Sequence, residues 1–174
     1  MSPPPNHFEL FGLPVRFRID TRALDDAYRA LQSEVHPDRH ASGNDADRRA
    51  AVESSTNVNA AYRALKDPVE RANYLLSLRG VDAFDENDTR LSIDFLEAQL
   101  ERREQAAEAA AASDVGALDR ILAGVREELR AREHDVARLL EDDARQDEAK
   151  SAVRELKFLA KVAEDVDAML AALD

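Results

Sequence analysis

The chain has 174 residues, 24 Lys and Arg against 36 Asp and Glu, and a net charge of -12. This acidic balance argues against nucleic acids and anionic membranes as partners, because both are bound by clustered Lys and Arg. The sequence contains no cysteine, which excludes disulfides, thiolate zinc sites and cysteine-ligated iron–sulfur clusters.

The composition and the N-terminus predict the fold class and the location. Ala, Leu and Arg are among the commonest residues, Glu is frequent, and there are only five Gly and six Pro, which predicts an all-α fold. No apolar run is long enough to cross a bilayer. Residues 1–6 lack the basic and apolar regions of a secretory signal, so we expect a cytoplasmic protein.

The first half of the chain predicts four helices. A short helix over residues 6–11 ends at Gly12 and Pro14. A second helix, capped by Asp20 or Thr21, extends to residue 35, and Pro37 stops it. A third helix spans residues 45–67, and a fourth begins at residue 68 and ends at residue 80. Helices two and three each carry one apolar face, comprising Leu24, Tyr28 and Leu31, and Val58, Tyr62 and Leu65.

The second half predicts a polar linker followed by three long helices. The linker covers residues 81–89, and the helices cover residues 92–112, 114–143 and 147–173. Apolar residues recur at steps of three and four along the last helix, which is typical of a helix packed against neighbours. Short connections predict an antiparallel three-helix bundle over residues 90–174. Residues 81–174 also carry the whole net charge, with 13 Lys and Arg against 25 Asp and Glu.

The tripeptide His36-Pro37-Asp38, followed by Arg39, lies between helices two and three. A solvated histidine in a proline-stopped loop is the simplest interpretation of an isolated copy of this tripeptide. A weak metal site of His36, Asp38 and His40, which Asp45 could complete, is a further alternative, but Pro37 prevents one helix from presenting both histidines. The ordered series of helix, tripeptide and helix favours a different interpretation, because it resembles a J-domain over residues 1–80.

Further motifs resemble one J-protein family, HscB, the J-type co-chaperone of iron–sulfur cluster assembly. They are His7-Phe8-Glu9-Leu10-Phe11-Gly12-Leu13-Pro14, Ala41-Ser42-Gly43 and Arg71-Ala72-Asn73-Tyr74-Leu75-Leu76-Ser77-Leu78-Arg79-Gly80. The resemblance extends from about His7 to the end of the chain. It implies a protein that performs no chemistry itself, is not an enzyme, and needs no cofactor or metal.

The resemblance implies that the J-domain contacts the chaperone ATPase HscA and stimulates ATP hydrolysis. The implied chaperone-binding residues are His36, Pro37, Asp38, Arg29 and Arg39. A carboxylate such as Asp38 suits a directional pair with a chaperone arginine. The helix before the tripeptide departs from the general J-domain, because its basic face is thin. Arg22 and Arg29 share this helix with the acidic residues Asp25, Asp26 and Glu34.

The resemblance also implies that the bundle binds the scaffold protein IscU. The implied scaffold-binding residues are Leu96, Glu97, Leu100, Glu101, Glu104 and Phe158. Glu97 stands where the family often has Met, which adds charge to an apolar patch. From the residues alone, Phe158 lies one position off the stripe of the last helix, with Arg154, Lys161 and Val162 on the same side. A boundary aromatic is therefore an alternative for Phe158.

A row of glutamates on the first bundle helix has an alternative interpretation as a solvated face. Glu97, Glu101, Glu104 and Glu108 repeat at steps of four, three and four. Such like charges mildly destabilise a helix. On this interpretation Arg102 and Arg103 relieve the repulsion.

We therefore expect an adaptor whose bundle delivers IscU and whose J-domain activates HscA. A general J-protein that serves unfolded clients through DnaK is the alternative. General J-proteins often carry a Gly/Phe-rich linker and cysteine-rich zinc modules, and this sequence has neither.

Overall fold

The computed structural model describes residues 5–35, 45–88 and 90–173, and these residues form helices without a strand. This result confirms the predicted all-α fold. The chain divides into two compact units, Met1–Leu75 and Leu76–Asp174. None of the described helices is long and apolar enough to cross a membrane.

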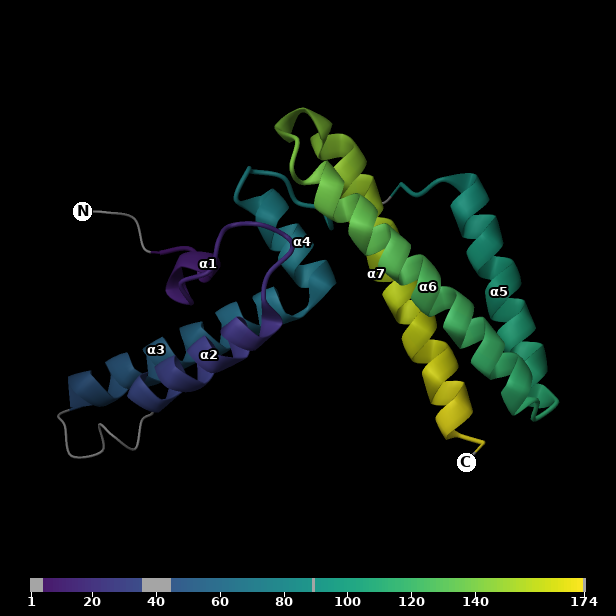
Figure 1. The fold of residues 1–174 in the computed structure, drawn as a ribbon, viewed down its shortest axis with the longest axis horizontal. Coiled ribbons are helices and arrows are strands. Elements are labelled where there is room, and N and C mark those ends of the chain that lie inside the picture. Colours follow the sequence, from purple (N-terminus) through teal and green to yellow (C-terminus); the bar gives the residue numbers. More distant parts are fainter. Residues whose placement is uncertain (1–4, 36–44, 89, 174) are drawn as a thin grey trace. The chain divides into compact units, whose positions relative to one another are not determined.

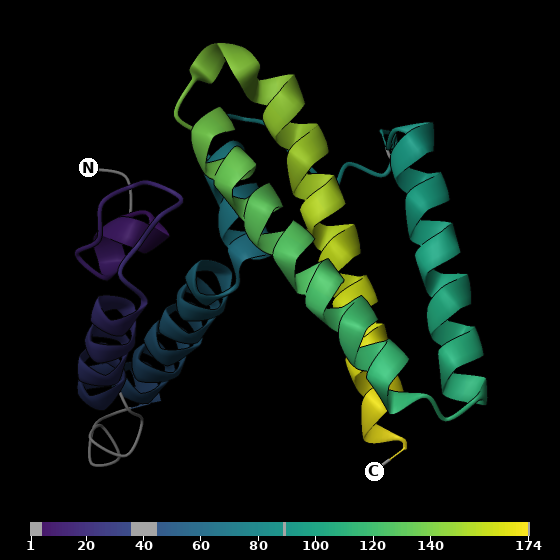
Figure 2. The same ribbon diagram turned by 45° about the vertical axis from the view of Figure 1, so that its right-hand side comes forward.

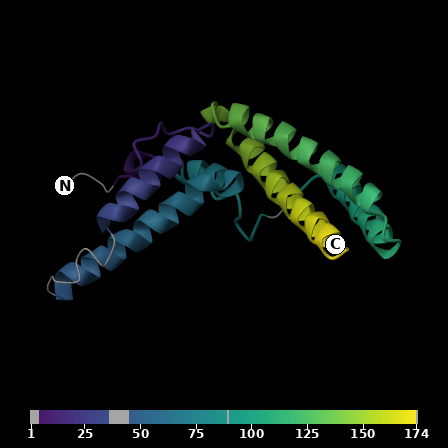
Figure 3. The same ribbon diagram turned by 60° about the horizontal axis from the view of Figure 1, so that its bottom comes forward.

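The first unit is built around a hairpin of two helices that lie side by side in Figures 1 and 3. Its helices are α1 (His7–Leu10), α2 (Thr21–Val35), α3 (Asp45–Lys66) and most of α4 (Pro68–Ser77). Asp20 caps α2, because its carboxylate accepts hydrogen bonds from the backbone N–H of Arg22 (2.9 Å) and Ala23 (3.2 Å). Asp67 caps α4 in the same way, at 2.8 Å from Val69 N.

Apolar side chains from three helices form the core of this unit. Phe8 of α1, Leu24 of α2 and Leu65 of α3 are fully buried. A buried cation completes the core: Arg71 donates to the carbonyl oxygen of Leu65 at 2.7 Å. Its guanidinium also lies 4.9 Å from the ring centroid of Phe17. The short α1 is therefore held by packing, since a single turn has little stability of its own.

A left-handed glycine ends α4, which lies partly in each unit. Gly80 has a φ of 77°, and the N–H of Val81 donates to the carbonyl oxygen of Leu76 at 3.0 Å. This is the Schellman arrangement, in which glycine takes the positive φ without a Cβ penalty. The helix ends at Ser77, three residues before the end predicted from the sequence.

The second unit contains an antiparallel bundle of three helices (Figures 1 and 2). They are α5 (Ile93–Ala111), α6 (Val115–Leu139) and α7 (Gln146–Ala171). The sequence predicted that the second bundle helix would continue to residue 143. Instead α6 ends at Leu139, and a short 3₁₀ turn, Asp143–Arg145, follows, because the Asp142 carboxylate caps it at Ala144 N (2.9 Å).

The aliphatic core of the bundle lies mainly between α6 and α7. Its buried residues include Leu118, Leu122, Val125 and Val136 of α6, and Leu156, Leu159, Val162 and Val166 of α7. The α5 helix adds large and polar side chains near its start, Phe95 and Gln99, and small ones near its end, Ala106 and Ala109. Figures 1 and 2 show α5 near α6 at their shared turn and further from α6 toward the start of α5.

Residues 81–88, expected as a linker, pack on α7. Ala83 is fully buried, and Arg154 Nε donates to its carbonyl oxygen at 2.7 Å. Lys157 Nζ lies 3.8 Å from the ring centroid of Phe84. Asp88 forms ion pairs with Lys150 Nζ at 2.9 Å and with Arg154 at 3.1 Å. This segment is therefore an ordered part of the second unit.

Candidate functional site

The α2–α3 hairpin brackets residues 36–44, and polar and aromatic contacts hold its two helices together. The rings of Tyr28 and Tyr62 stack with centroids 4.0 Å apart. Asp25 accepts a hydrogen bond from the Tyr62 hydroxyl at 2.9 Å and from Lys66 Nζ at 2.7 Å. These two donors hold the pKa of Asp25 below its ordinary value. These contacts join the start of α2 to the end of α3, at the end of the hairpin away from residues 36–44.

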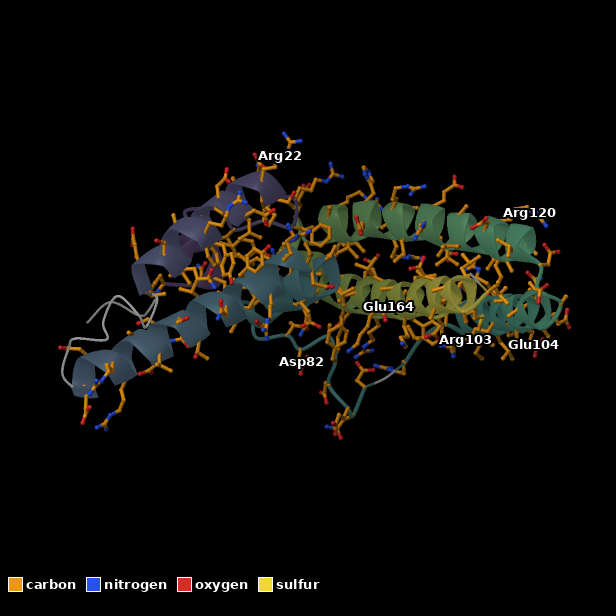
Figure 4. All side chains as sticks on the ribbon, turned by 90° about the horizontal axis from the view of Figure 1, so that it is seen from below. Arg22, Asp82, Arg103, Glu104, Arg120 and Glu164 are labelled. Carbon is orange, nitrogen blue, oxygen red and sulfur yellow. The ribbon has the colours of Figure 1, made fainter. Side chains whose placement is uncertain are left out.

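Four of the five predicted chaperone-binding residues, His36, Pro37, Asp38 and Arg39, lie outside the described residues. The fifth, Arg29, lies on α2 with its side chain 72% exposed and its guanidinium 2.5 Å from Asp26. The basic face of α2 is therefore partly neutralised by a carboxylate on the same helix. Arg22, at the start of α2, is exposed (Figure 4).

The predicted scaffold-binding leucines lie on the side of α5 opposite the bundle core. Leu96 is 41% exposed and Leu100 is 60% exposed, whereas Phe95 and Gln99 are buried. Phe95 therefore points toward the core. An α-helix turns about 100° per residue, so Leu96 and Leu100 lie about 100° and 140° around the axis from Phe95. The α5 helix therefore presents apolar side chains both to the core and to solvent.

Phe158 of α7 is half-buried against α5. Its ring meets Phe95 edge-on, with centroids 5.7 Å apart. The guanidinium of Arg103 lies 5.3 Å from the ring centroid of Phe158 and pairs with Asp165 at 3.1 Å. The structure thus joins Phe158 to the helix that carries Leu96 and Leu100. Arg103 is labelled on α5 in Figure 4.

The buried surface of α7 is wider than the stripe predicted from the sequence. Arg154 and Val162, expected beside Phe158 off the stripe, are buried, and Lys161 is exposed. The Phe158 side of α7 therefore faces α5 and residues 81–88. This arrangement agrees with the boundary position considered for Phe158 from the sequence.

Three glutamates flank the exposed leucines, and the neighbouring arginines do not balance them. Glu97, Glu101 and Glu104 are exposed, and in the described parts of the chain none of them forms an ion pair. Arg102 instead pairs with Glu128 of α6 at 2.7 Å, and Arg103 reaches Asp165 of α7. The predicted relief of the glutamates by these arginines is therefore wrong, because both side chains cross to other helices.

The contacts of Arg103 and Arg154 were not predicted from the sequence. Arg103 follows Leu96 by seven residues, so it continues the leucine side of α5, and this spacing was the available signal. For Arg154 no local signal exists, because its partners lie about 70 residues earlier in the chain, at Ala83 and Asp88. The pKa of Asp88 lies well below its ordinary value because Arg90, Arg154 and Lys150 surround the carboxylate.

The possibility of a metal site gains no support from the described residues, where no three His, Asp or Glu side chains converge on one point. The trio His36, Asp38 and His40, considered from the sequence, lies outside those residues.

Comparison with known proteins defines the class. Residues 6–74 match the family model of the DnaJ domain, and residues 91–167 match that of the HSCB C-terminal oligomerisation domain. A J-domain joined to such a domain defines a J-domain co-chaperone, which is not an enzyme class. J-domains act with chaperones of the heat-shock-seventy class.

The relatives then specify the family. The co-chaperone protein HscB homolog of Burkholderia vietnamiensis is 49% identical over 169 residues, which cover 97% of this chain and 96% of the relative. The solved structure of the chaperone HscB from Vibrio cholerae has a TM-score of 0.88 at 35% identity, covering 98% of this chain and 100% of that one. Human HscB has a TM-score of 0.84 at 27% identity, covering 97% of this chain and 83% of that one. The chain therefore belongs to the HscB family, the J-domain co-chaperones of iron–sulfur cluster assembly, as the sequence predicted.

Proposed function

We propose that this protein couples the scaffold IscU to the chaperone HscA. The J-domain, residues 1–80, binds HscA through His36, Pro37, Asp38, Arg29 and Arg39 and stimulates its ATPase. The bundle, residues 90–174, binds IscU through Leu96, Glu97, Leu100, Glu101, Glu104 and Phe158, after the segment 81–89. A cytoplasmic location stays a prediction from the sequence.

The observation that carries this proposal is the two-sided character of α5. A helix that packs by one face normally presents polar residues on the other, yet α5 exposes Leu96 and Leu100 there. Water-exposed leucines beside unbalanced glutamates fit a protein partner that has an apolar patch edged by Lys and Arg. Such a surface gives binding energy through the leucines and orientation through the charges.

The J-domain would act by differential affinity, because a ligand shifts a chaperone's equilibrium only when it binds one state better. Arg29 enters that contact already paired with Asp26. An exposed pair of this kind contributes little energy, so a partner carboxylate can replace Asp26 at small cost. The tripeptide loop therefore carries the larger share of the contact.

Steady-state ATPase assays with HscA and IscU test the coupling. We expect the wild-type protein and IscU to stimulate hydrolysis together, and Asp38→Ala to abolish the stimulation while leaving IscU binding unchanged. Glu53→Ala, which removes an exposed acid from α3, is the matched control and should behave as wild type. No stimulation by the wild type, or full stimulation by Asp38→Ala, would contradict the proposal. Stimulation of DnaK with recovery of mixed unfolded chains and no IscU would favour a general J-protein.

A further inference from the structure

The first residue of α5, Ile93, is an exposed apolar side chain that none of the predicted sites includes. It is 72% exposed, more than Leu96 or Leu100. Its backbone is held firmly, because Ser92 caps the helix with its hydroxyl 3.2 Å from Phe95 N. Isoleucine is a weaker helix former than alanine or leucine, and here it adds nothing to the core. Neither helix formation nor core packing therefore explains an isoleucine at this position.

The helical register places Ile93 within the partner surface. At about 100° per residue, Ile93 lies about 20° from Leu100 and about 60° from Leu96 around the α5 axis. Glu104 lies about 20° away on the opposite side. Ile93 thus falls between the leucines and the glutamates. Phe95, which packs inward, lies about 160° away from it.

We infer that Ile93 is a third apolar anchor for the scaffold, at the N-terminal end of a stripe formed by Ile93, Leu96 and Leu100. This inference rests on the proposed function and extends its site by one helical turn. The partner surface that fits this stripe is an elongated apolar patch with basic groups along one edge only. That charge pattern follows from the glutamates, which lie on one side of the stripe, while Arg103 ends it on the other side.

The bundle contains a matched control for this residue. Val115 is also β-branched, is also the first residue of its helix, and is 42% exposed. It follows the cap Asp114 as Ile93 follows Ser92. Val115 lies at the α5–α6 turn, the opposite end of α5 from Ile93. Replacing either residue by alanine leaves the core unchanged and favours the helix slightly.

Titration of fluorescently labelled IscU with four proteins tests the inference: wild type, Ile93→Ala, Val115→Ala and the double variant Leu96→Ala/Leu100→Ala. We expect Ile93→Ala to weaken binding about tenfold, because three carbon groups lose their burial. Val115→Ala should stay within about twofold of wild type, since it lies off the stripe. Circular dichroism of each variant should show unchanged helix content.

The dependence of binding on salt sharpens the test. Ile93→Ala removes apolar surface and no charge, so its affinity should fall with salt as steeply as that of wild type. Glu104→Gln should flatten the dependence, because it removes one charge from the interface.

Failure of the inference is distinguishable from failure of the proposed function. If the double variant loses IscU and Ile93→Ala binds like wild type, the inference is overturned and the proposed function stands. If wild type itself does not bind IscU, both are overturned. If sedimentation shows that Ile93→Ala disrupts pairing between copies of this chain and leaves IscU binding intact, Ile93 belongs to a self-contact and the inference is overturned.

Discussion

The hairpin of the first unit and the bundle of the second hold their helices together by different means. Across the hairpin, stacked tyrosines and the pairing of Asp25 with Lys66 join α2 to α3. In the bundle, α6 and α7 share an aliphatic core, and the buried Arg154 of α7 binds residues 81–88 through the carbonyl oxygen of Ala83. The hairpin also pairs its exposed charges internally, as in Arg29 with Asp26. On α5, by contrast, Leu96 and Leu100 are exposed beside Glu97, Glu101 and Glu104, which form no ion pair with any residue that the structure describes. This difference agrees with the proposal that the first unit binds its partner through His36, Pro37 and Asp38 and the bundle through the exposed side of α5.

The largest expected effect on stability comes from the buried Arg154, which joins residues 81–88 to α7. Arg154→Ala removes the hydrogen bond to Ala83 and the ion pair with Asp88, both formed by a side chain that is 8% exposed. We expect a loss of about 2–4 kcal/mol in the free energy of unfolding, because a charge-assisted hydrogen bond to a buried carbonyl oxygen and an ion pair with Asp88 are lost together. Urea unfolding followed by circular dichroism measures it. Arg90→Ala is the control, since Arg90 pairs with the same Asp88 from a side chain that is 90% exposed. Equal losses in Arg154→Ala and Arg90→Ala would contradict the idea that burial makes the Arg154 contacts the stronger ones.

A smaller, pH-dependent effect is expected at Asp88. Its pKa lies below the ordinary value of 3.8, so its contribution to stability is present above pH 4 and is lost as the pH falls. Asp88→Asn should therefore destabilise the protein at pH 7, by less than Arg154→Ala, since Arg154 keeps its bond to Ala83. Unfolding curves at decreasing pH should show wild type and Asp88→Asn converging. A difference that persists unchanged at pH 3 would indicate that the carboxylate's charge is not responsible.

The smallest expected effect lies in the hairpin. Tyr62→Phe keeps the stack with Tyr28 and removes the hydrogen bond to Asp25, which should cost about 1 kcal/mol of unfolding free energy. A double-mutant cycle with Asp25→Ala isolates that bond. Once Asp25 is replaced the bond is already lost, so Tyr62→Phe should cost less in that background. A Tyr62→Phe cost that is the same in both backgrounds would show that the phenol contributes in another way. A cost larger than that of Arg154→Ala would reverse the comparison between the units.

Local periodicity predicted most of the fold, because apolar spacing and caps act within one helix. The all-α class and a cap of α2 at Asp20 or Thr21 were predicted from the sequence, and the structure places the cap at Asp20. The sequence predicted the end of α6 four residues too late. Asp142 can either continue a helix or cap the turn that follows, and the sequence alone does not distinguish the two.

Contacts between segments distant in the chain were not predictable. The sequence places Arg103 beside Glu104, but the folded chain takes its guanidinium to Asp165 and Phe158. The polar composition of residues 81–89 predicted a linker but not that Ala83 would be fully buried within it. Spacing along one helix identifies neighbours on that helix and carries no information on which distant carboxylate or carbonyl a long side chain will reach.

The gradient of side-chain size along the inner face of α5 has a mechanical consequence. Phe95 spaces the helix from α7 near its start, whereas Ala106 and Ala109 allow close approach near its end. The difference in side-chain size between the two ends of α5 therefore sets the tilt of this helix. A larger residue at position 106 would push this end of α5 away from the other two helices and reorient the distant leucines, although Ala106 itself is buried. We therefore expect the size of the side chains at positions 106 and 109 to influence the direction in which Leu96 and Leu100 point.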